Sequence, residues 1–200
     1  YAIVDLWRRH GASPRTGYEA EAQSVARLVC TSTSRNLVRV FFLQERLKGL
    51  GGKEPPAGGH VHVVGAGVMG GDIAAWCALR GFTVTLQDRD AEFVQPALER
   101  ARAFFEKRSR VPGKAAEQLA RLQADVAGQG IERADVVIEA IFENAEAKRE
   151  LYSRIEPRLK PTALLATNTS SLMLEPLAEQ LAVPGRLVGL HFFNPVAQMP

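Results

Sequence analysis

The first quarter of the chain carries apolar residues at the three- and four-residue spacing of amphipathic helices. Residues 18–29 and 35–48 both follow this pattern, and we expect each to form a helix. The residues that share the apolar face of the second helix are Leu37, Val38, Phe41 and Phe42. We expect the helices to pack through the two phenylalanines. Residues 49–59 hold five glycines and two prolines, which predicts a helix end followed by a linker.

From His60 onward, short apolar runs alternate with helical stretches. The runs that predict strands are 61–67, 82–88, 134–140, 163–169 and 186–192. The stretches that predict helices are 69–80, 90–108, 113–124, 143–159 and 173–181. Strands that alternate with helices indicate a parallel sheet covered on both faces. We therefore expect an α/β fold, a doubly wound and mainly parallel sheet, over residues 60–200, and a helical segment with its linker over residues 1–59.

Composition and charge narrow the class of protein. The 200 residues are 46% apolar and 24% charged, which is ordinary for a globular protein. The sequence has no run of about 18 apolar residues, so it predicts no membrane-spanning helix. In the first ten residues the charges follow the apolar stretch, whereas in a signal peptide they precede it. The basic excess lies in residues 1–59 and is too spread out to indicate nucleic acid. Cys30 and Cys77 lack metal-ligand spacing, so we expect a reducing compartment, the cytoplasm.

The strongest local motif is a G-x-G-x-x-G turn, and it is formed by Gly65, Gly67 and Gly70. It lies between a predicted strand and a predicted helix, as in Rossmann-type folds, where the glycines admit a pyrophosphate to a helix N-terminus. Asp88 ends the next strand, eighteen residues after Gly70. A carboxylate at that place accepts hydrogen bonds from the adenosine ribose and repels a 2′-phosphate, which favours NAD over NADP, although Arg89 could weaken that preference.

Three further segments follow predicted strands: EAIFEN at 139–144, NTSS at 168–171 and HFFNPV at 191–196. Together with GAGVMG at 65–70, and in this order and spacing, they resemble the NAD-binding domain of 3-hydroxyacyl-CoA dehydrogenases. Residues 1–50 resemble the end of the hydratase module and the connecting helix of bifunctional fatty-acid oxidation proteins. Because the chain begins at Tyr1 and stops at Pro200, the resemblance implies a central piece of a protein that has both hydratase and dehydrogenase activities.

The resemblance also implies roles for single residues. His191 would take the proton of the 3-hydroxyl group, Ser170 would bind the substrate oxygen, and Asn194 would position the nicotinamide or the reacting group. Glu143 and Lys148 would contact the cofactor ribose and the substrate. The implied cofactor-binding residues are Gly65, Gly67, Met69, Gly70, Asp88, Ile141, Phe142, Glu143, Lys148 and Asn168. The implied reaction is NAD-dependent oxidation of (S)-3-hydroxyacyl-CoA to 3-oxoacyl-CoA, with a thiolase subunit as a possible partner of the whole protein.

Two departures from the family pattern bear on activity. The family's glutamate about a dozen residues after the histidine, and the helical domain that covers the acyl-CoA, would both follow Pro200. We therefore expect this chain to bind NAD without turnover. Family contacts to the CoA nucleotide would come from Lys107, Arg108 or Arg110, although a solvated basic helix end explains these residues equally well. The alternatives are a non-catalytic NAD-binding relative and another two-domain hydroxyacid dehydrogenase.

Overall fold

The structure is a computed structural model that describes residues 1–11, 14–50, 58–109 and 111–199. It divides into two compact units, Tyr1–Pro55 and Pro56–Pro200. Most of the predicted linker, residues 51–57, lies outside the described residues. In the described part of the chain, no helix has the length and apolar character needed to cross a membrane.

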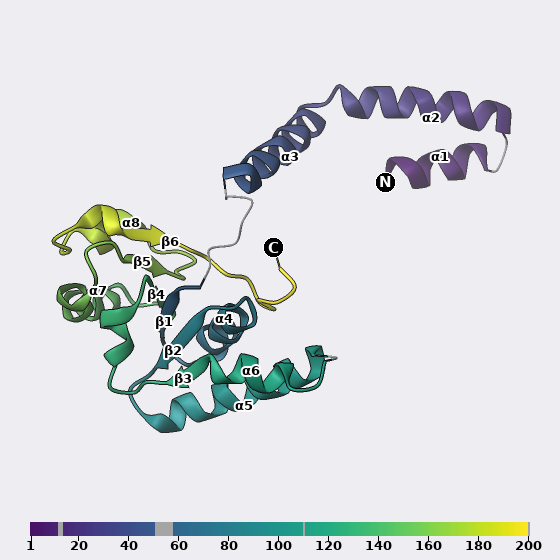
Figure 1. The fold of residues 1–200 in the computed structure, drawn as a ribbon. Coiled ribbons are helices and arrows are strands. Elements are labelled where there is room, and N and C mark those ends of the chain that lie inside the picture. The colour runs from purple at the N-terminus through teal and green to yellow at the C-terminus, as the bar shows by residue number, and fades with distance from the viewer. Residues whose placement is uncertain (12–13, 51–57, 110, 200) are drawn as a thin grey trace. The chain divides into compact units, whose positions relative to one another are not determined.

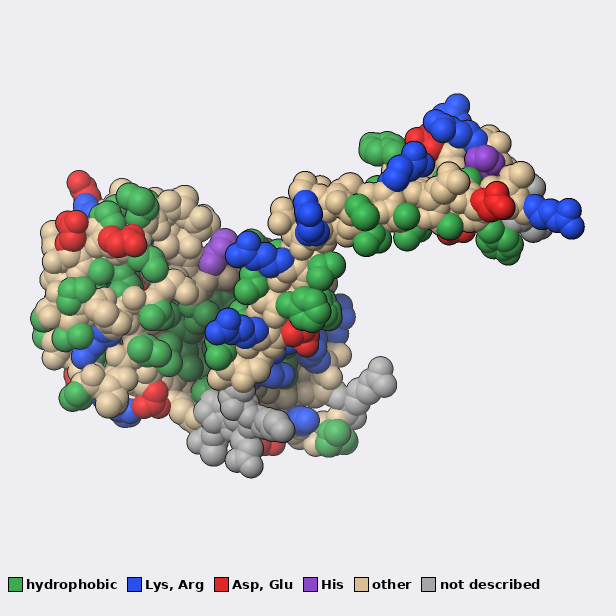
Figure 2. Space-filling model, turned by 90° about the horizontal axis from the view of Figure 1, so that it is seen from above, with side chains coloured by type: hydrophobic (Ala, Val, Ile, Leu, Met, Phe, Trp, Pro, Cys, Tyr) green, Lys and Arg blue, Asp and Glu red, His purple; other side chains and the backbone are tan. Residues whose placement is uncertain are grey.

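The first unit is helical, as predicted. Its helices are α1 (Ala2–His10), α2 (Pro14–Val29) and α3 (Ser32–Leu50). Helix α1 folds back along α2, whereas α3 runs away from α2 (Figure 1). The expected packing through Phe41 and Phe42 is wrong for the described residues of this unit: the side chains are 57% and 64% exposed, and their rings meet edge to face. Figure 2 shows apolar side chains spread along the surface of the unit.

The second unit is a doubly wound sheet whose strands all pair in parallel. Within the described residues its strand order is β3-β2-β1-β4-β5-β6. The strands are β1 (His60–Val64), β2 (Thr83–Gln87), β3 (Leu122–Ala124), β4 (Val136–Glu139), β5 (Leu164–Thr167) and β6 (Leu187–Gly189). The helices are α4 (Val68–Leu79), α5 (Ala91–Arg108), α6 (Lys114–Ala120), α7 (Ala145–Ile155) and α8 (Leu174–Ala178), with short 3-10 helices η1 (Gln129–Arg133), η2 (Glu156–Arg158) and η3 (Pro184–Arg186). The predicted fold class is confirmed.

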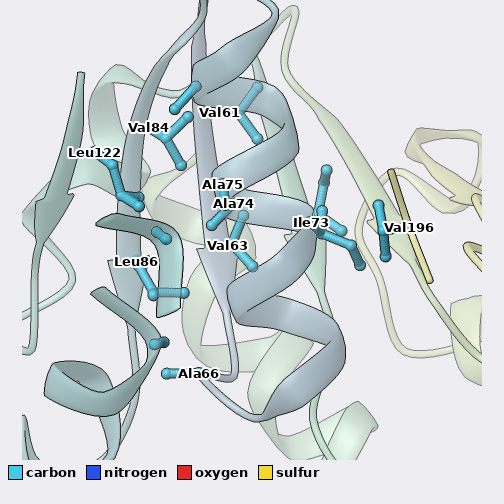
Figure 3. Packing of buried hydrophobic residues seen from close by; sticks show 14 of the residues in the cluster. Val61, Val63, Ala66, Ile73, Ala74, Ala75, Val84, Leu86, Leu122 and Val196 are labelled. Carbon is cyan, nitrogen blue, oxygen red and sulfur yellow. The ribbon is translucent and has the colours of Figure 1, made fainter. Parts of the chain in front are cut away.

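Alternation along the strands sends side chains to two separate cores. Val63 of β1 packs under α4 and α5 in one apolar cluster, while the next residue, Val64, joins the cluster under α7. Figure 3 shows the first cluster, in which Ile73 of α4 lies beside Val196 from the C-terminal segment. Val196 is buried, so the segment that follows β6 is fixed against the helix that follows the glycine turn.

One predicted element is wrong in type. The helix expected over 113–124 ends at Ala120, and Leu122–Ala124 forms the edge strand β3, which pairs with β2. Three residues are too few to display a period of two, so this strand is defined by its partner and not by its own pattern. The remaining predicted strands and helices of this unit appear within a few residues of their expected bounds, and the stretch 143–159 divides into α7 and η2.

Candidate functional site

The glycine turn joins β1 to α4 at the point where the strand order reverses between β1 and β4. Gly65 has φ +104°, and a Cβ there would lie 2.5 Å from the Ala140 carbonyl oxygen. A Cβ at Gly70 would lie 1.8 Å from the Gly65 carbonyl oxygen, so α4 can approach β1 only without one. These contacts explain why the turn requires glycine at both positions.

Gly67 differs from the other two glycines because the space beside it is open. A Cβ at Gly67 would meet no atom within 4 Å, and its φ of −59° suits any residue. Gly67 is the N-cap of the twelve-residue helix α4, and no side chain caps this helix end. Arg100 of α5 donates a hydrogen bond to the Gly67 carbonyl oxygen (3.2 Å). Unobstructed N–H groups with a nearby cation fit a diphosphate group.

Asp88 follows β2 and reaches back to the glycine turn. Its Oδ2 accepts a hydrogen bond from the Ala66 backbone N–H (2.7 Å), and its Oδ1 accepts one from the Arg89 N–H (2.7 Å). The Arg89 guanidinium carbon lies 5.4 Å from the centre of the Phe93 ring. The predicted ribose-binding carboxylate is therefore held beside the predicted phosphate turn.

The carboxyl end of β4 carries a buried carboxylate that the sequence analysis did not single out. Glu139 is completely buried, and its Oε1 accepts hydrogen bonds from Lys148 Nζ (2.7 Å) and the Ile141 N–H (2.8 Å). Its Oε2 accepts hydrogen bonds from the hydroxyl groups of Tyr152 and Thr167, both at 2.7 Å. The proximity of Glu139 raises the pKa of Tyr152 further, after the larger effect of burial. An acidic residue in the apolar run ADVVIEA was the signal that could have identified Glu139, because buried carboxylates need partners.

Glu143 joins the loop after β4 to the loop after β5. Its Oε1 accepts hydrogen bonds from Thr169 Oγ1 (2.5 Å), the Ser170 N–H (3.0 Å) and the Ser171 N–H (3.2 Å). Lys148 Nζ lies 3.3 Å from its Oε2. Burial favours the neutral acid, but the hydrogen bonds and the lysine charge outweigh this effect and lower the pKa of Glu143 to about 2.

The ordinary interpretation of Glu143 and Lys148 would be an ion pair on a helix surface. Lys148 is 1% exposed, so this interpretation does not apply. Phe142, by contrast, is 70% exposed, while the Met69 side chain packs against the core of α4 and α5.

The segment after β6 is tied to β5 by Asn168. The Asn168 side-chain oxygen accepts a hydrogen bond from the Phe192 N–H (2.7 Å). His191 and Asn194 are exposed, and the His191 ring lies 4.4 Å, centre to centre, from the ring of Phe193. Within the described residues, no hydrogen bond joins His191 to Ser170 or Asn194. The three expected catalytic residues thus lie on neighbouring loops without direct bonds between them.

The basic residues proposed for CoA contacts are only partly described. Arg108, at the end of α5, lies over the rings of Trp76 (5.5 Å) and Phe104 (5.8 Å). Lys107 is exposed, and Arg110 lies outside the described residues.

The predicted site residues thus gather at the carboxyl ends of parallel strands. The glycine turn follows β1, Asp88 follows β2, and the remaining segments follow β4, β5 and β6. In open α/β sheets this edge, at the reversal of strand order, is where dinucleotides bind. The geometry fits a dinucleotide that lies across the glycine turn, with a ribose near Asp88.

Comparisons with known proteins agree with this geometry. A model of the family described as "3-hydroxyacyl-CoA dehydrogenase, NAD binding domain" matches residues 60–200. The chain is 34% identical, over 189 residues, to the fatty acid oxidation complex subunit alpha of Pseudomonas putida F1, and 33% identical, over 193 residues, to that of Ectopseudomonas oleovorans. Each match covers 91% of this chain and 26% of the relative, so the chain spans about a quarter of their length.

Solved structures of dehydrogenases resemble the second unit. The 3-hydroxybutyryl-CoA dehydrogenase of Escherichia coli K12 matches with a TM-score of 0.67 and 34% identity, over 70% of this chain and 31% of the other. The (S)-3-hydroxybutyryl-CoA dehydrogenase of Ralstonia eutropha matches with a TM-score of 0.66 and 32% identity, over 70% of this chain and 51% of the other.

Proposed function

Because this chain belongs to the 3-hydroxyacyl-CoA dehydrogenase NAD-binding domain family, we propose that it is the NAD-binding part of a larger enzyme that oxidises (S)-3-hydroxyacyl-CoA to 3-oxoacyl-CoA. The observation that carries the proposal is the glycine turn with Asp88 hydrogen-bonded to it. NAD, when bound, accepts the hydride from C3 of the substrate. The proposed division of the chain is a helical segment over 1–59 and the NAD-binding domain over 60–200.

The cofactor would be held from both sides of the glycine turn. The backbone at Gly65, Gly67, Met69 and Gly70 would bind the pyrophosphate at the start of α4. Asp88 would accept hydrogen bonds from the adenosine ribose. The residues that would hold the nicotinamide half are Ile141, Phe142, Glu143, Lys148 and Asn168.

The reacting group would be held by the two loops that follow β5 and β6. Ser170 would bind the 3-oxygen of the substrate, and His191 would accept the hydroxyl proton as the hydride leaves. Asn194 would fix the relative positions of substrate and nicotinamide. His191 is exposed on a segment that Val196 and Asn168 fix to the domain, which supports its access to a substrate.

The test is an assay of the full-length parent on 3-hydroxyacyl-CoAs of graded chain length with NAD. We expect NADH formation that His191→Ala reduces by at least a hundredfold, because general base catalysis contributes about 10²–10⁴ in rate. Unchanged turnover in that variant would contradict the assignment of the base. Lack of turnover with every chain length would contradict the proposed reaction.

We further propose that the chain by itself binds NAD without turnover, since it spans about a quarter of the length of its relatives. For the parent, a thiolase that cleaves the 3-oxoacyl-CoA product is the proposed partner, and the name of the relatives as subunits of a complex supports it. The cytoplasm is the proposed location. Co-purification of the parent with thiolase activity, compared with a parent that lacks residues 1–59, tests the partner.

A further inference from the structure

Five residues form a closed ring of contacts at the carboxyl ends of β4 and β5. Glu139 binds Lys148 through one oxygen and Thr167 through the other. Lys148 lies against Glu143, and Glu143 accepts a hydrogen bond from the Thr169 hydroxyl. The Thr169 N–H donates to Thr167 Oγ1 (3.3 Å), which closes the ring. We call these residues the carboxylate ring.

Glu139 is the residue of the carboxylate ring with the most partners. Four donors surround its carboxylate, and two of them, Lys148 and Tyr152, lie on α7. Glu139 and Lys148 are both within 1% of complete burial, so neither can exchange its partner for water. A buried pair of this kind holds both side chains in one place, because every alternative position would leave a charge unpartnered.

The carboxylate ring also borders the glycine turn. The Ile141 N–H that binds Glu139 lies 3.1 Å from the position that a Cβ on Gly65 would occupy. On its opposite side the ring contains Glu143, which binds the backbone of the exposed Ser170. Glu139 is thus connected to both of the loops that follow β4 and β5 at the carboxyl ends of the strands, but it is not itself exposed there.

We propose that Glu139 is a positioning residue for the nicotinamide half of the cofactor: through Lys148 and Thr167 it holds the loops 141–144 and 168–171 in their binding arrangement. The proposal rests on the proposed function. It concerns only one half of the cofactor, because Asp88 places the adenosine half at the β2 side of the glycine turn, and a dinucleotide that crosses the turn extends toward β4 and β5.

Replacement of Glu139 by Gln tests the proposal, because the amide keeps the volume of the side chain but removes its charge. Titration calorimetry with NAD and with ADP, which contains only the adenosine half, measures the effect on each half. We expect the Kd for NAD to rise at least tenfold and the Kd for ADP to change less than twofold. A merely structural role would weaken both ligands alike, and that result would overturn the proposal.

Tyr152→Phe provides a second test if the Gln variant does not fold. It removes one hydrogen-bond donor to Glu139 and keeps the aromatic ring of residue 152 in place. We expect a two- to fivefold rise in the Kd for NAD alone. Glu156→Gln is the control: the Glu156 carboxylate accepts hydrogen bonds from the backbone N–H groups of Ala182 and Val183, and Glu156 lies in η2, between α7 and β5, away from the carboxyl ends of the strands. This control should leave both affinities unchanged.

The proposed function and the role of Glu139 predict different binding results. If the unmodified chain binds neither NAD nor ADP, the proposed function itself is wrong, and the role of Glu139 with it. If the unmodified chain binds both ligands and neither variant changes the ratio of the two Kd values, only the role of Glu139 is wrong.

Discussion

The two halves of the site are built in different ways. Around β1 and β2, the protein presents backbone: glycines that allow close approach, an uncapped helix end, and Asp88 held by two backbone N–H groups. Around β4 and β5, it presents side chains, and the carboxylate ring joins two buried charged residues to two loops. The first half therefore requires glycines, which have no Cβ atom, and the second half requires that its buried charges be paired.

This difference predicts different responses to mutation. A backbone site tolerates changes to its neighbours but not the addition of one carbon atom at a crowded glycine. A buried ionic site loses stability when one of its charges is removed, because the partner left behind cannot reach water.

The largest effect is expected from Lys148→Met, which leaves Glu139 buried without a cation. Loss of one partner of a buried pair costs about 3–5 kcal/mol in the free energy of unfolding, which urea denaturation measures. The matched control is Lys160→Met, which breaks an exposed pair with Asp135 (2.8 Å) and should cost less than about 1 kcal/mol. Equal losses in the two variants would mean that burial does not distinguish the pairs.

The glycine turn allows a comparison of two alanines. Gly70→Ala forces a Cβ against the Gly65 carbonyl oxygen. This variant should lose about 1–3 kcal/mol in the free energy of unfolding, and it should also lose NAD binding. A Cβ in Gly67→Ala meets no protein atom within 4 Å, so stability should stay within about 0.5 kcal/mol while the NAD affinity falls at least tenfold. If Gly67→Ala bound NAD normally, the phosphate would not lie against this position.

In the β1–β2 half, Asp88 is the residue that we expect to distinguish NAD from NADP. We expect NAD to bind more tightly by at least ~1.4 kcal/mol, tenfold in Kd, because the carboxylate repels a 2′-phosphate. Asp88→Ala should narrow this difference, and Arg89→Gln should widen it, because Arg89 is the adjacent cation. Equal dissociation constants for the two cofactors in the unmodified chain would remove Asp88 from this role.

The smallest effect concerns His62, which is fully buried on β1 and bonded to Thr85 and Gln87 (2.8 and 2.9 Å). Burial lowers the pKa of His62 below 6.5, although Asp125 raises it in part. Below pH 6.5 the unfolded chain therefore takes up a proton that the folded chain does not. His62 should therefore lower the free energy of unfolding as the pH decreases, by at most about 1.4 kcal/mol per pH unit.

His62→Gln isolates this contribution, since His60, whose pKa burial also lowers, remains in both proteins. The pH dependence of unfolding in the variant should be shallower between pH 5 and 6.5. Parallel curves for the two proteins would show that His62 keeps an ordinary pKa.

Glu143 contributes to stability in a separate, lower pH range, because its stabilising effect is lost only as the pH falls from about 4.5 toward its lowered pKa of about 2.

The sequence predicted the backbone half of the site better than the side-chain half. The spacing of Gly65, Gly67 and Gly70 is a local property that follows from the turn itself, and its place between β1 and α4 is confirmed. The side-chain partners of Glu139 are nine, thirteen and twenty-eight residues away in sequence, and only the folded sheet brings them together. No local pattern encodes such a cluster.

Two other misses have the same cause. The edge strand β3 is defined by β2 and not by its own three residues. The apolar spacing of Phe41 and Phe42 gave a helix correctly, but a helical pattern alone does not specify a packing partner. The binding and catalytic roles of the individual site residues stay predictions, because their positions at one sheet edge do not by themselves assign a role.

The most direct test of the account is the melting temperature of this chain with and without NAD, in parallel with His191→Ala. At NAD one hundred times its Kd, binding adds ~2.7 kcal/mol of stability, which for a chain of this size raises the melting temperature by roughly 5–10 °C. We expect this rise in both proteins, because the glycine turn and Asp88 are the proposed cofactor site and His191 is proposed to act on the substrate. A chain whose melting temperature did not change with NAD would contradict it.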